Sequence, residues 1–378
     1  MSRVRKTLQI PLLAILALWA EMALADWETN LTQGVTEISR EVYWMHMAVM
    51  GICAVIGLVV FGVMAVSIIR HRKSRGVTPA TFHENIVAEV IWTVIPFAIL
   101  IGMAIPAAKA LIKMEDTSDA DLTLKITGYQ WKWEYEYLDK DVRFFSNLAE
   151  TSREAAALDS GIDVTKMEHY LLEVDNPVVL PVGKKIRFLL TSNDVIHAWW
   201  IPEFAVKKDA IPGFINQMWT NIDEPGTYRG QCAELCGKDH GYMPVVVEAV
   251  SEEEFDAWIL EQQELAKAEL ESGDREWALA ELMERGEKTY QSACAACHQP
   301  TGTGIPGAFP ALAGNAEMLA DLDGHIDTLI NGRAGTAMQA FGSQLSDVDI
   351  AAVVTYARNA WGNDTGDVIQ PSQIKDAR

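Results

Sequence analysis

Two long apolar runs constrain this chain more than any other feature of its sequence. Residues Met45 to Ile69 contain no charged side chain, and Val87 to Ala108 contain only one, Glu89. Each run is long enough to cross a bilayer, where backbone groups must be hydrogen-bonded within the segment, so both are predicted to be transmembrane helices. The loop between them contains Arg70-His-Arg-Lys-Ser-Arg75. By the positive-inside rule this loop is cytoplasmic, and both ends of the hairpin (residues 26–115) then lie outside.

The first 25 residues have the pattern of a secretory signal. Three basic residues lead into the apolar run Ile10 to Ala20, and Ala23-Leu-Ala25 supplies an A-x-A cleavage site. The alternative is a short uncleaved membrane anchor. Both interpretations start the following residues outside the cytoplasm, in agreement with the basic loop.

Glu89 is the one ionisable side chain within the second apolar run. Such a group is costly inside a membrane and is therefore a functional candidate. It also lies one turn from the start of the run, where it could simply face the lipid headgroups. The residues alone leave both interpretations open.

Residues 116–250 change to short runs rich in β-branched and aromatic side chains. Turn-forming stretches such as Pro181-Val-Gly183 and Glu224-Pro-Gly-Thr227 separate these runs, which indicates a small all-β sandwich. The clearest predicted strands are Thr123–Thr127, Lys132–Tyr137, Lys185–Leu190 and Val245–Glu248.

A loop near the end of this domain gathers soft metal ligands. Cys232, Cys236, His240 and Met243 lie within twelve residues, and His197 comes from an earlier predicted strand. Thiolate, imidazole and thioether ligands select copper. A blue copper site needs one Cys, whereas two thiolates can bridge a pair of copper ions that take one imidazole each, with Met243 and a backbone carbonyl as weak ligands. A zinc site or a disulfide is the alternative.

Several stretches together resemble subunit II of the haem-copper cytochrome c oxidases, whose outer domain is a cupredoxin. The resemblance implies a binuclear copper A centre and a magnesium ion that the Glu234 side chain reaches at the interface with subunit I. The implied copper ligands are His197, Cys232, Glu234 through its carbonyl oxygen, Cys236, His240 and Met243. The matching stretches are Ala88-Glu-Val-Ile-Trp-Thr-Val-Ile-Pro96, Gly128-Tyr-Gln-Trp-Lys-Trp-Glu-Tyr-Glu-Tyr137, Asp194-Val-Ile-His197, Lys208-Asp-Ala-Ile-Pro-Gly213 and Gln231-Cys-Ala-Glu-Leu-Cys-Gly-Lys-Asp-His-Gly-Tyr-Met243.

The same resemblance gives roles to two further residues. Trp131 matches the tryptophan at which an electron from cytochrome c enters, although by itself it reads as an ordinary strand aromatic. Glu89 matches the glutamate at the mouth of a proton path into subunit I. One position departs from the pattern: many relatives have Arg after the Pro-Gly, where this chain has Phe214, so the contacts of that arginine are not expected here.

The last part of the chain predicts an acidic linker and a haem domain. Residues 251–290 contain 13 acidic and 4 basic side chains with little Gly or Pro, which indicates a largely helical segment whose linker portion is 251–285. Its acidity forms a solvated face or helps to receive a basic cytochrome. Cys294-Ala-Ala-Cys297-His298 is the covalent haem c signature, with His298 as an iron ligand. Residues 286–365 are therefore predicted to be a helical class I cytochrome c domain, followed by a tail at 366–378.

The sixth haem ligand is predicted to be Met338. It lies in the Gly-rich segment Gly332-Arg-Ala-Gly-Thr-Ala-Met338, before the last helix that is predicted from Ser346. The competitor is Met318, whose surroundings Asn315 to Asp321 look helical and favour packing. A methionine ligand raises the haem potential relative to a second histidine, as suits an electron donor to copper.

A subunit II with a fused cytochrome c domain resembles a caa-type terminal oxidase in a bacterial inner membrane. The resemblance implies that electrons from a periplasmic cytochrome c or another donor pass through haem c and copper A to subunit I, where oxygen is reduced to water and protons are translocated, with subunit III as a further partner. Of the eight histidines only His46 lies in or beside a span, so the oxygen site belongs to another chain. The alternatives are the electron-accepting subunit of a copper A nitric oxide reductase and a membrane-anchored electron shuttle.

The formal charge of −21 excludes a general affinity for nucleic acid or anionic lipid. It favours a basic protein partner through electrostatic steering. The alternative is that the acidity keeps the exported domains soluble.

Overall fold

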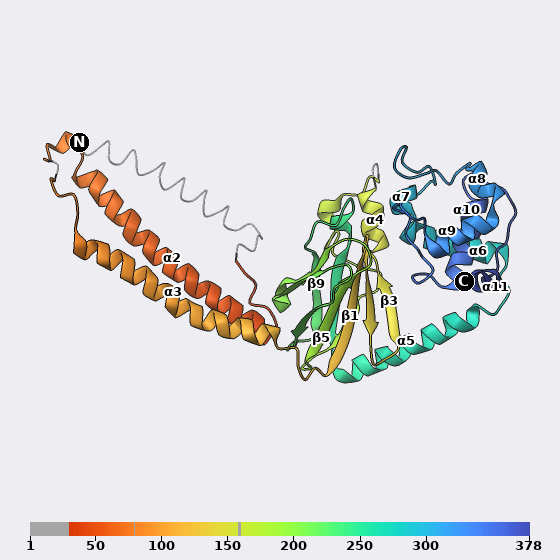
Figure 1. Ribbon diagram of the computed structural model, residues 1–378, viewed down its shortest axis with the longest axis horizontal. Helices are drawn as coiled ribbons and strands as arrows, with labels where there is room; N and C mark the ends of the chain where they lie inside the picture. The colour runs from red at the N-terminus through yellow and green to blue at the C-terminus, as the bar shows by residue number, and fades with distance from the viewer. Residues whose placement is uncertain (1–29, 79, 158–159) are drawn as a thin grey trace. The chain divides into compact units, whose positions relative to one another are not determined.

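The computed structural model describes residues 30–78, 80–157 and 160–378 (Figure 1). It forms two compact units. The first holds the described residues up to Asp139 together with those of Arg143–Phe255, and the second holds Lys140–Val142 and Asp256–Arg378. The predicted signal sequence at residues 1–25 lies outside the described residues.

Two long helices form the N-terminal hairpin, α2 (Glu37–Arg70) and α3 (Ile86–Glu115). A capping box between Thr36 and Ser39 starts α2, and the Asn85 side chain accepts the Ala88 N–H at the start of α3, so both N-termini have partners for their first amides. Within the described residues these two helices are long and apolar enough to cross a membrane. Each contains one of the predicted spans.

The ends of the hairpin are tied to the β-domain by polar contacts. Lys113 of α3 forms ion pairs with Glu37 (2.5 Å) and Glu41 (3.0 Å) of α2. The Trp219 indole N–H donates to the Lys113 carbonyl at 2.9 Å. The ion pairs join the outer ends of the two helices to each other, and the indole hydrogen bond joins α3 to β8.

The β-domain is a sandwich of two five-stranded sheets in the described part of the chain, which confirms the predicted all-β cupredoxin fold. The sheet orders are β3-β2-β1-β5-β8 and β4-β10-β9-β6-β7. The strands are β1 (Leu122–Tyr129), β2 (Lys132–Tyr137), β3 (Val142–Ser146), β4 (Val178–Pro181), β5 (Ile186–Ser192), β6 (His197–Ile201), β7 (Val206–Ala210), β8 (Asn216–Thr220), β9 (Gly226–Cys232) and β10 (Pro244–Val250).

Aromatic side chains join the two sheets through the core. The Tyr137 hydroxyl of β2 donates to the Val179 carbonyl of β4 at 2.7 Å and accepts the Val179 N–H at 3.2 Å. The Trp199 indole of β6 donates to the Tyr135 hydroxyl of β2 at 3.1 Å. These aromatic rings are almost fully buried, so each polar tip that is withdrawn from water has a hydrogen-bond partner.

Short helical segments decorate the first unit. Helix α4 (Glu150–Ala156) lies in the connection between β3 and β4. The two ends of this connection are joined by the Asp175 carboxylate, which accepts the backbone N–H of Asn147 at 2.7 Å and the side-chain amide of Asn147 at 2.9 Å. The remaining pieces are 3-10 turns at Lys73–Arg75, Val164–Lys166, Pro202–Phe204 and His240–Tyr242.

The elements that follow β10 are all helices. The stretch 251–290, predicted to be largely helical, is interrupted at 273–278. There the Trp277 indole donates to the Ser272 carbonyl, and the Trp277 backbone N–H donates to the Gln370 side chain. Helix α6 packs closely on α10, because Gly286 lies directly against the Ala352 backbone. The helices are α5 (Glu252–Ser272), α6 (Leu279–Ala293), α7 (Ala295–His298), α8 (Ala316–Ala320), α9 (Leu322–Asn331), α10 (Asp347–Asn359) and α11 (Pro371–Ala377).

Candidate functional site

Sheet pairing brings the predicted copper ligands together. His197 opens β6, and Cys232 closes the neighbouring strand β9, where it pairs with Trp199. Cys236 follows in the loop after β9, His240 begins a 3-10 turn, and Met243 directly precedes β10. The loop between two paired strands therefore folds back over the end of β6.

The two cysteine sulfurs lie at the centre of this group, 3.9 Å apart. Cys232 Sγ is 3.9 Å from His197 Nδ1 and 3.3 Å from the Glu234 carbonyl oxygen. On the other side, Cys236 Sγ is 3.4 Å from His240 Nδ1 and 3.5 Å from Met243 Sδ. Each thiol thus has one imidazole and one weak donor as neighbours.

This donor set fits a pair of copper ions. A sulfur separation of 3.9 Å is far longer than a disulfide bond, and neither cysteine is in a disulfide within the described chain. His197, Cys232 and Cys236 are buried, and their ligand atoms lie within 4.8 Å of one another. Soft donors arranged symmetrically about two sulfurs suit copper better than a single tetrahedral zinc ion.

The two thiols differ in their acidity. The hydrogen bond between the two sulfurs lowers the pKa of Cys232 to about 4, and the same interaction, together with burial, raises the pKa of Cys236 well above its usual range. The pair therefore releases its first proton easily and holds its second. A bound cation must displace that second proton before both sulfurs can act as thiolates.

Close packing holds the His197 ring. A Cβ on Gly128 would lie only 2.7 Å from His197 Cδ2, so β1 must carry glycine at this point. The Trp133 indole meets the same ring edge-on, with 5.8 Å between centroids. Burial by itself lowers the pKa of His197, but hydrogen bonds to Asp194 and Cys232 outweigh it and raise that pKa.

Asp194 is a residue to which the sequence analysis assigned no role. Its Oδ1 lies 2.9 Å from His197 Nε2, which leaves Nδ1 directed toward Cys232. The only sequence signal was its place in the matching stretch Asp194-Val-Ile-His197. A carboxylate on the far nitrogen of a ligand histidine sets the ring's tautomer and orientation.

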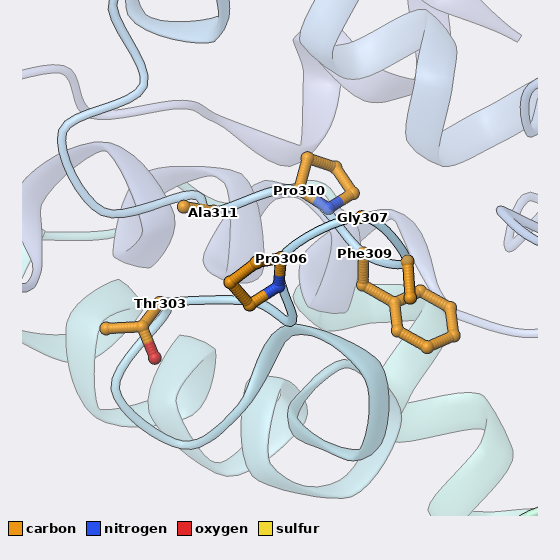
Figure 2. Close-up of a pocket in the computed structure, with 7 residues that line it drawn as sticks. Thr303, Pro306, Gly307, Phe309, Pro310 and Ala311 are labelled. Carbon is orange, nitrogen blue, oxygen red and sulfur yellow. The ribbon is translucent and has the colours of Figure 1, made fainter.

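The haem signature occupies the end of one helix and the start of the next. Cys294 follows α6, and Cys297 and His298 lie on α7. His298 Nδ1 is 2.9 Å from the Pro310 carbonyl oxygen, an arrangement that leaves Nε2 as the available ligand atom. Residues 303 and 306–311 of the same loop surround a cavity of about 360 Å³, with Pro306, Phe309 and Pro310 at its wall (Figure 2).

Two methionines are the predicted alternatives for the second iron ligand, and one buried histidine lies in the same helical unit. Met338 is half-buried and packs against the core of the helical unit. Met318 lies on α8, as its surroundings indicated, where Arg358 donates to its carbonyl at 2.9 Å. His325 on α9 has a solvent-excluded Nδ1 that lacks a hydrogen-bond partner among the described residues. Two cysteines at the haem c spacing and an oriented His298 fit a bound haem.

Three family models match the chain. The model for the cytochrome c oxidase subunit II periplasmic domain matches residues 122–250, and the model for its transmembrane domain matches residues 25–110. Among curated proteins, the probable cytochrome c oxidase subunit 2 of Rickettsia felis is 38% identical over 64% of this chain and 73% of its own length. The chain belongs to the cytochrome c oxidase subunit 2 family. Residues 281–356 match the model for cbb3-type cytochrome c oxidase subunit III, so this subunit 2 carries a cytochrome c domain, consistent with a caa-type fusion.

A further curated relative agrees with this assignment. Cytochrome c oxidase subunit 2 of Cereibacter sphaeroides is 34% identical over 65% of this chain and 83% of that protein. A crystal structure of the periplasmic domain of subunit II of cytochrome oxidase from Bradyrhizobium japonicum is 41% identical, covers 39% of this chain and 97% of its own, and has a TM-score of 0.34. As an oxidase subunit 2, the chain is a membrane-anchored component of an oxidoreductase complex and partners subunit I.

The remaining predicted residues of subunit 2 lie at separate places. Trp131 is in the turn between β1 and β2, and its indole N–H donates to the Cys236 carbonyl at 3.3 Å. It therefore directly contacts the loop between β9 and β10, residues 233–243, which we call the metal loop. The Glu234 side chain is exposed, as is Phe214. Glu89 lies in the first turn of α3, where Oε1 accepts the Asn85 N–H at 3.4 Å beside a shallow hollow lined by Ile86, Val90, Thr93 and Val94.

Proposed function

We propose that this chain accepts electrons from a periplasmic cytochrome c or another donor and delivers them to a haem of subunit I, where oxygen is reduced to water with proton translocation. Cys294 and Cys297 attach haem c covalently, with His298 and Met338 as iron ligands. His197, Cys232, Glu234, Cys236, His240 and Met243 hold the binuclear copper A centre. When bound, the two groups supply reversible one-electron redox chemistry.

The remaining residues serve the transfer and the assembly. Trp131 is the point at which electrons enter the copper domain, and Glu89 lies at the mouth of the proton path into subunit I. The Glu234 side chain contributes to a magnesium site at the interface with subunit I. The protein lies in the bacterial inner membrane with its copper and haem domains on the periplasmic side, and subunit III is a further partner.

The observation that carries this proposal is the sulfur pair with an imidazole on each side. Cys232 Sγ and Cys236 Sγ lie 3.9 Å apart, and His197 Nδ1 and His240 Nδ1 lie 3.9 and 3.4 Å from one sulfur each. Two thiolates held this close would let a pair of copper ions share one electron, which would keep the charge change at each ion small. Such a centre would supply electron transfer.

Metal analysis and electron paramagnetic resonance (EPR) of the purified chain test the copper centre. We expect two coppers per haem and a seven-line mixed-valence signal. One copper per haem with a four-line signal would refute the binuclear assignment.

The role in the complex is tested separately. Purified complex supplied with reduced cytochrome c should consume oxygen at a rate that inhibitors of haem-copper oxidases abolish. Nitric oxide reduction without oxygen uptake would identify the partner as a nitric oxide reductase instead. A chain that exchanges electrons with soluble donors but copurifies with no histidine-rich membrane subunit would identify a shuttle.

A further inference from the structure

Gln130 links two segments of the candidate copper site that are far apart in sequence. It lies in the turn between β1 and β2, next to Trp131. Its backbone N–H donates to Asp194 Oδ2 at 2.7 Å, and its side-chain Nε2 donates to the Cys236 carbonyl oxygen at 2.8 Å. One residue thus contacts both the segment that leads into His197 and the segment that carries Cys236.

The first contact acts on His197 through Asp194. The carboxylate uses one oxygen for Gln130 and the other for His197 Nε2 (2.9 Å) and the Val195 N–H (2.7 Å). A carboxylate held at both oxygens cannot rotate freely. The imidazole is therefore oriented with Nδ1 toward Cys232.

The second contact acts on the main chain at Cys236. Its carbonyl oxygen also accepts the Trp131 indole N–H at 3.3 Å, so two neighbouring side chains share one acceptor. The next residue, Gly237, has a φ of +122°, and a Cβ there would lie 3.0 Å from Gln130 Nε2 and 3.1 Å from Trp131 Cζ2. A left-handed glycine thus lets the turn approach the metal loop closely.

We propose that Gln130 is a positioning residue that holds the His197 side of the copper centre in register with the Cys236 side and keeps Trp131 against the Cys236 backbone. The inference rests on the proposed copper centre. His197 and Cys236 lie on different segments of the chain. Pairing of β6 with β9 fixes the position of Cys232 relative to His197, but it does not fix the position of Cys236. The two hydrogen bonds of Gln130 connect the Cys236 segment to the Asp194 segment. A redox centre with a low reorganisation energy requires ligands that are held rigidly.

The test uses the full chain loaded with copper and compares two substitutions with a matched control. Gln130→Leu removes the side-chain donor but keeps the backbone N–H to Asp194. Gln130→Glu keeps size and polarity, so the turn still folds, but its carboxylate cannot donate to a carbonyl. Gln217→Leu changes an exposed glutamine of the same sandwich, which measures the general effect of the replacement.

We expect both Gln130 variants to release copper to a chelator about 10- to 100-fold faster than Gln217→Leu, as is typical when an outer partner of a metal ligand is lost. Their copper hyperfine pattern should change while the thermal midpoint of the sandwich stays that of the control. Equal copper release and an unchanged EPR spectrum in both Gln130 variants would overturn the positioning role alone. A wild-type chain that holds no copper pair would overturn the proposed centre and this inference together.

Discussion

The identity of the distal haem ligand is a question about single residues. Met338 and Met318 are both candidates by chemistry. Met338 packs against the core of the helical unit, whereas Met318 lies on α8 and Arg358 of α10 donates to its carbonyl. We expect Met338→Ala to abolish the methionine-to-iron absorption band of the haem and to lower its reduction potential, because a thioether ligand stabilises the reduced iron. The matched variant Met318→Ala should keep both. A band that survives in Met338→Ala and disappears in Met318→Ala would reverse the assignment.

His325 makes the stability of the helical unit depend on pH. Burial lowers the pKa of His325 to about 4, and the positive charge of Arg358 adds to the effect. Below pH 6.5 the unfolded chain therefore binds a proton that the folded chain refuses. Stability should be lost as the pH falls from about 6.5 to about 4, by up to about 3 kcal/mol.

Thermal unfolding of the haem-loaded chain between pH 7.5 and pH 4, at about half-unit steps, measures this loss. His325→Phe removes the titrating group and should flatten the decline. His83→Phe, an exposed histidine outside the helical unit, should leave it unchanged. Equal declines for wild type and His325→Phe would show that other groups carry the pH dependence.

The crossing of α6 and α10 depends on a missing side chain. A Cβ at Gly286 would lie 2.2 Å from the Ala352 carbonyl oxygen and 2.6 Å from Tyr356 Cβ, and neither atom can move without shifting α10. Gly286→Val should therefore destabilise the unit by about 1–3 kcal/mol, as overpacking does.

Denaturant unfolding followed by the haem absorption reports this change. Lys288→Ala, on the exposed face of the same helix, is the control and should shift the free energy of unfolding by less than about 0.5 kcal/mol. A Gly286→Val chain as stable as this control would mean that the two helices can separate without cost.

The elements were largely predictable because their patterns are local. Alternating β-branched and aromatic residues predicted β1, β2, β5 and β10, and uninterrupted apolar runs predicted the membrane helices. Helix α11 and the break at 273–278 were not predicted, because both depend on contacts distant in sequence: the Trp277 N–H bonds to Gln370, and the Gln370 amide returns to the Trp277 carbonyl.

The same distinction applies to the candidate metal site. Four proposed ligands lie within twelve residues and could be recognised as one cluster of soft donors. Asp194 and Gln130 could not, because an aspartate before a strand and a glutamine in a turn are common and gain meaning only when β1, β5 and β6 bring them together. Gly128 could not be recognised either, because the requirement for glycine at this position arises from the His197 ring on another strand.

At the scale of the whole molecule, the acidity is concentrated in the part predicted to face outward. Residues 116–378 contain 44 acidic and 21 basic side chains, whereas residues 1–115 contain 8 and 10. If the acidic side chains lay farther than a Debye length from the place where the donor binds, the association rate would be insensitive to the sign of the donor's charge. A charge that steers a donor would make the association rate fall with salt for a basic donor and rise for an acidic one.

Stopped-flow reduction of the loaded chain by a basic and by an acidic cytochrome c separates these two roles. We expect the second-order rate constant for the basic donor to fall about tenfold between about 10 and 200 mM salt, because the Debye length shrinks from about 30 Å to below 10 Å. The acidic donor should show the opposite slope, and electron transfer within the chain, measured after rapid photoreduction, should not change. Second-order rate constants that do not change with salt for either donor would assign the acidity to solubility, because long-range attraction between charged partners must weaken as salt screens it.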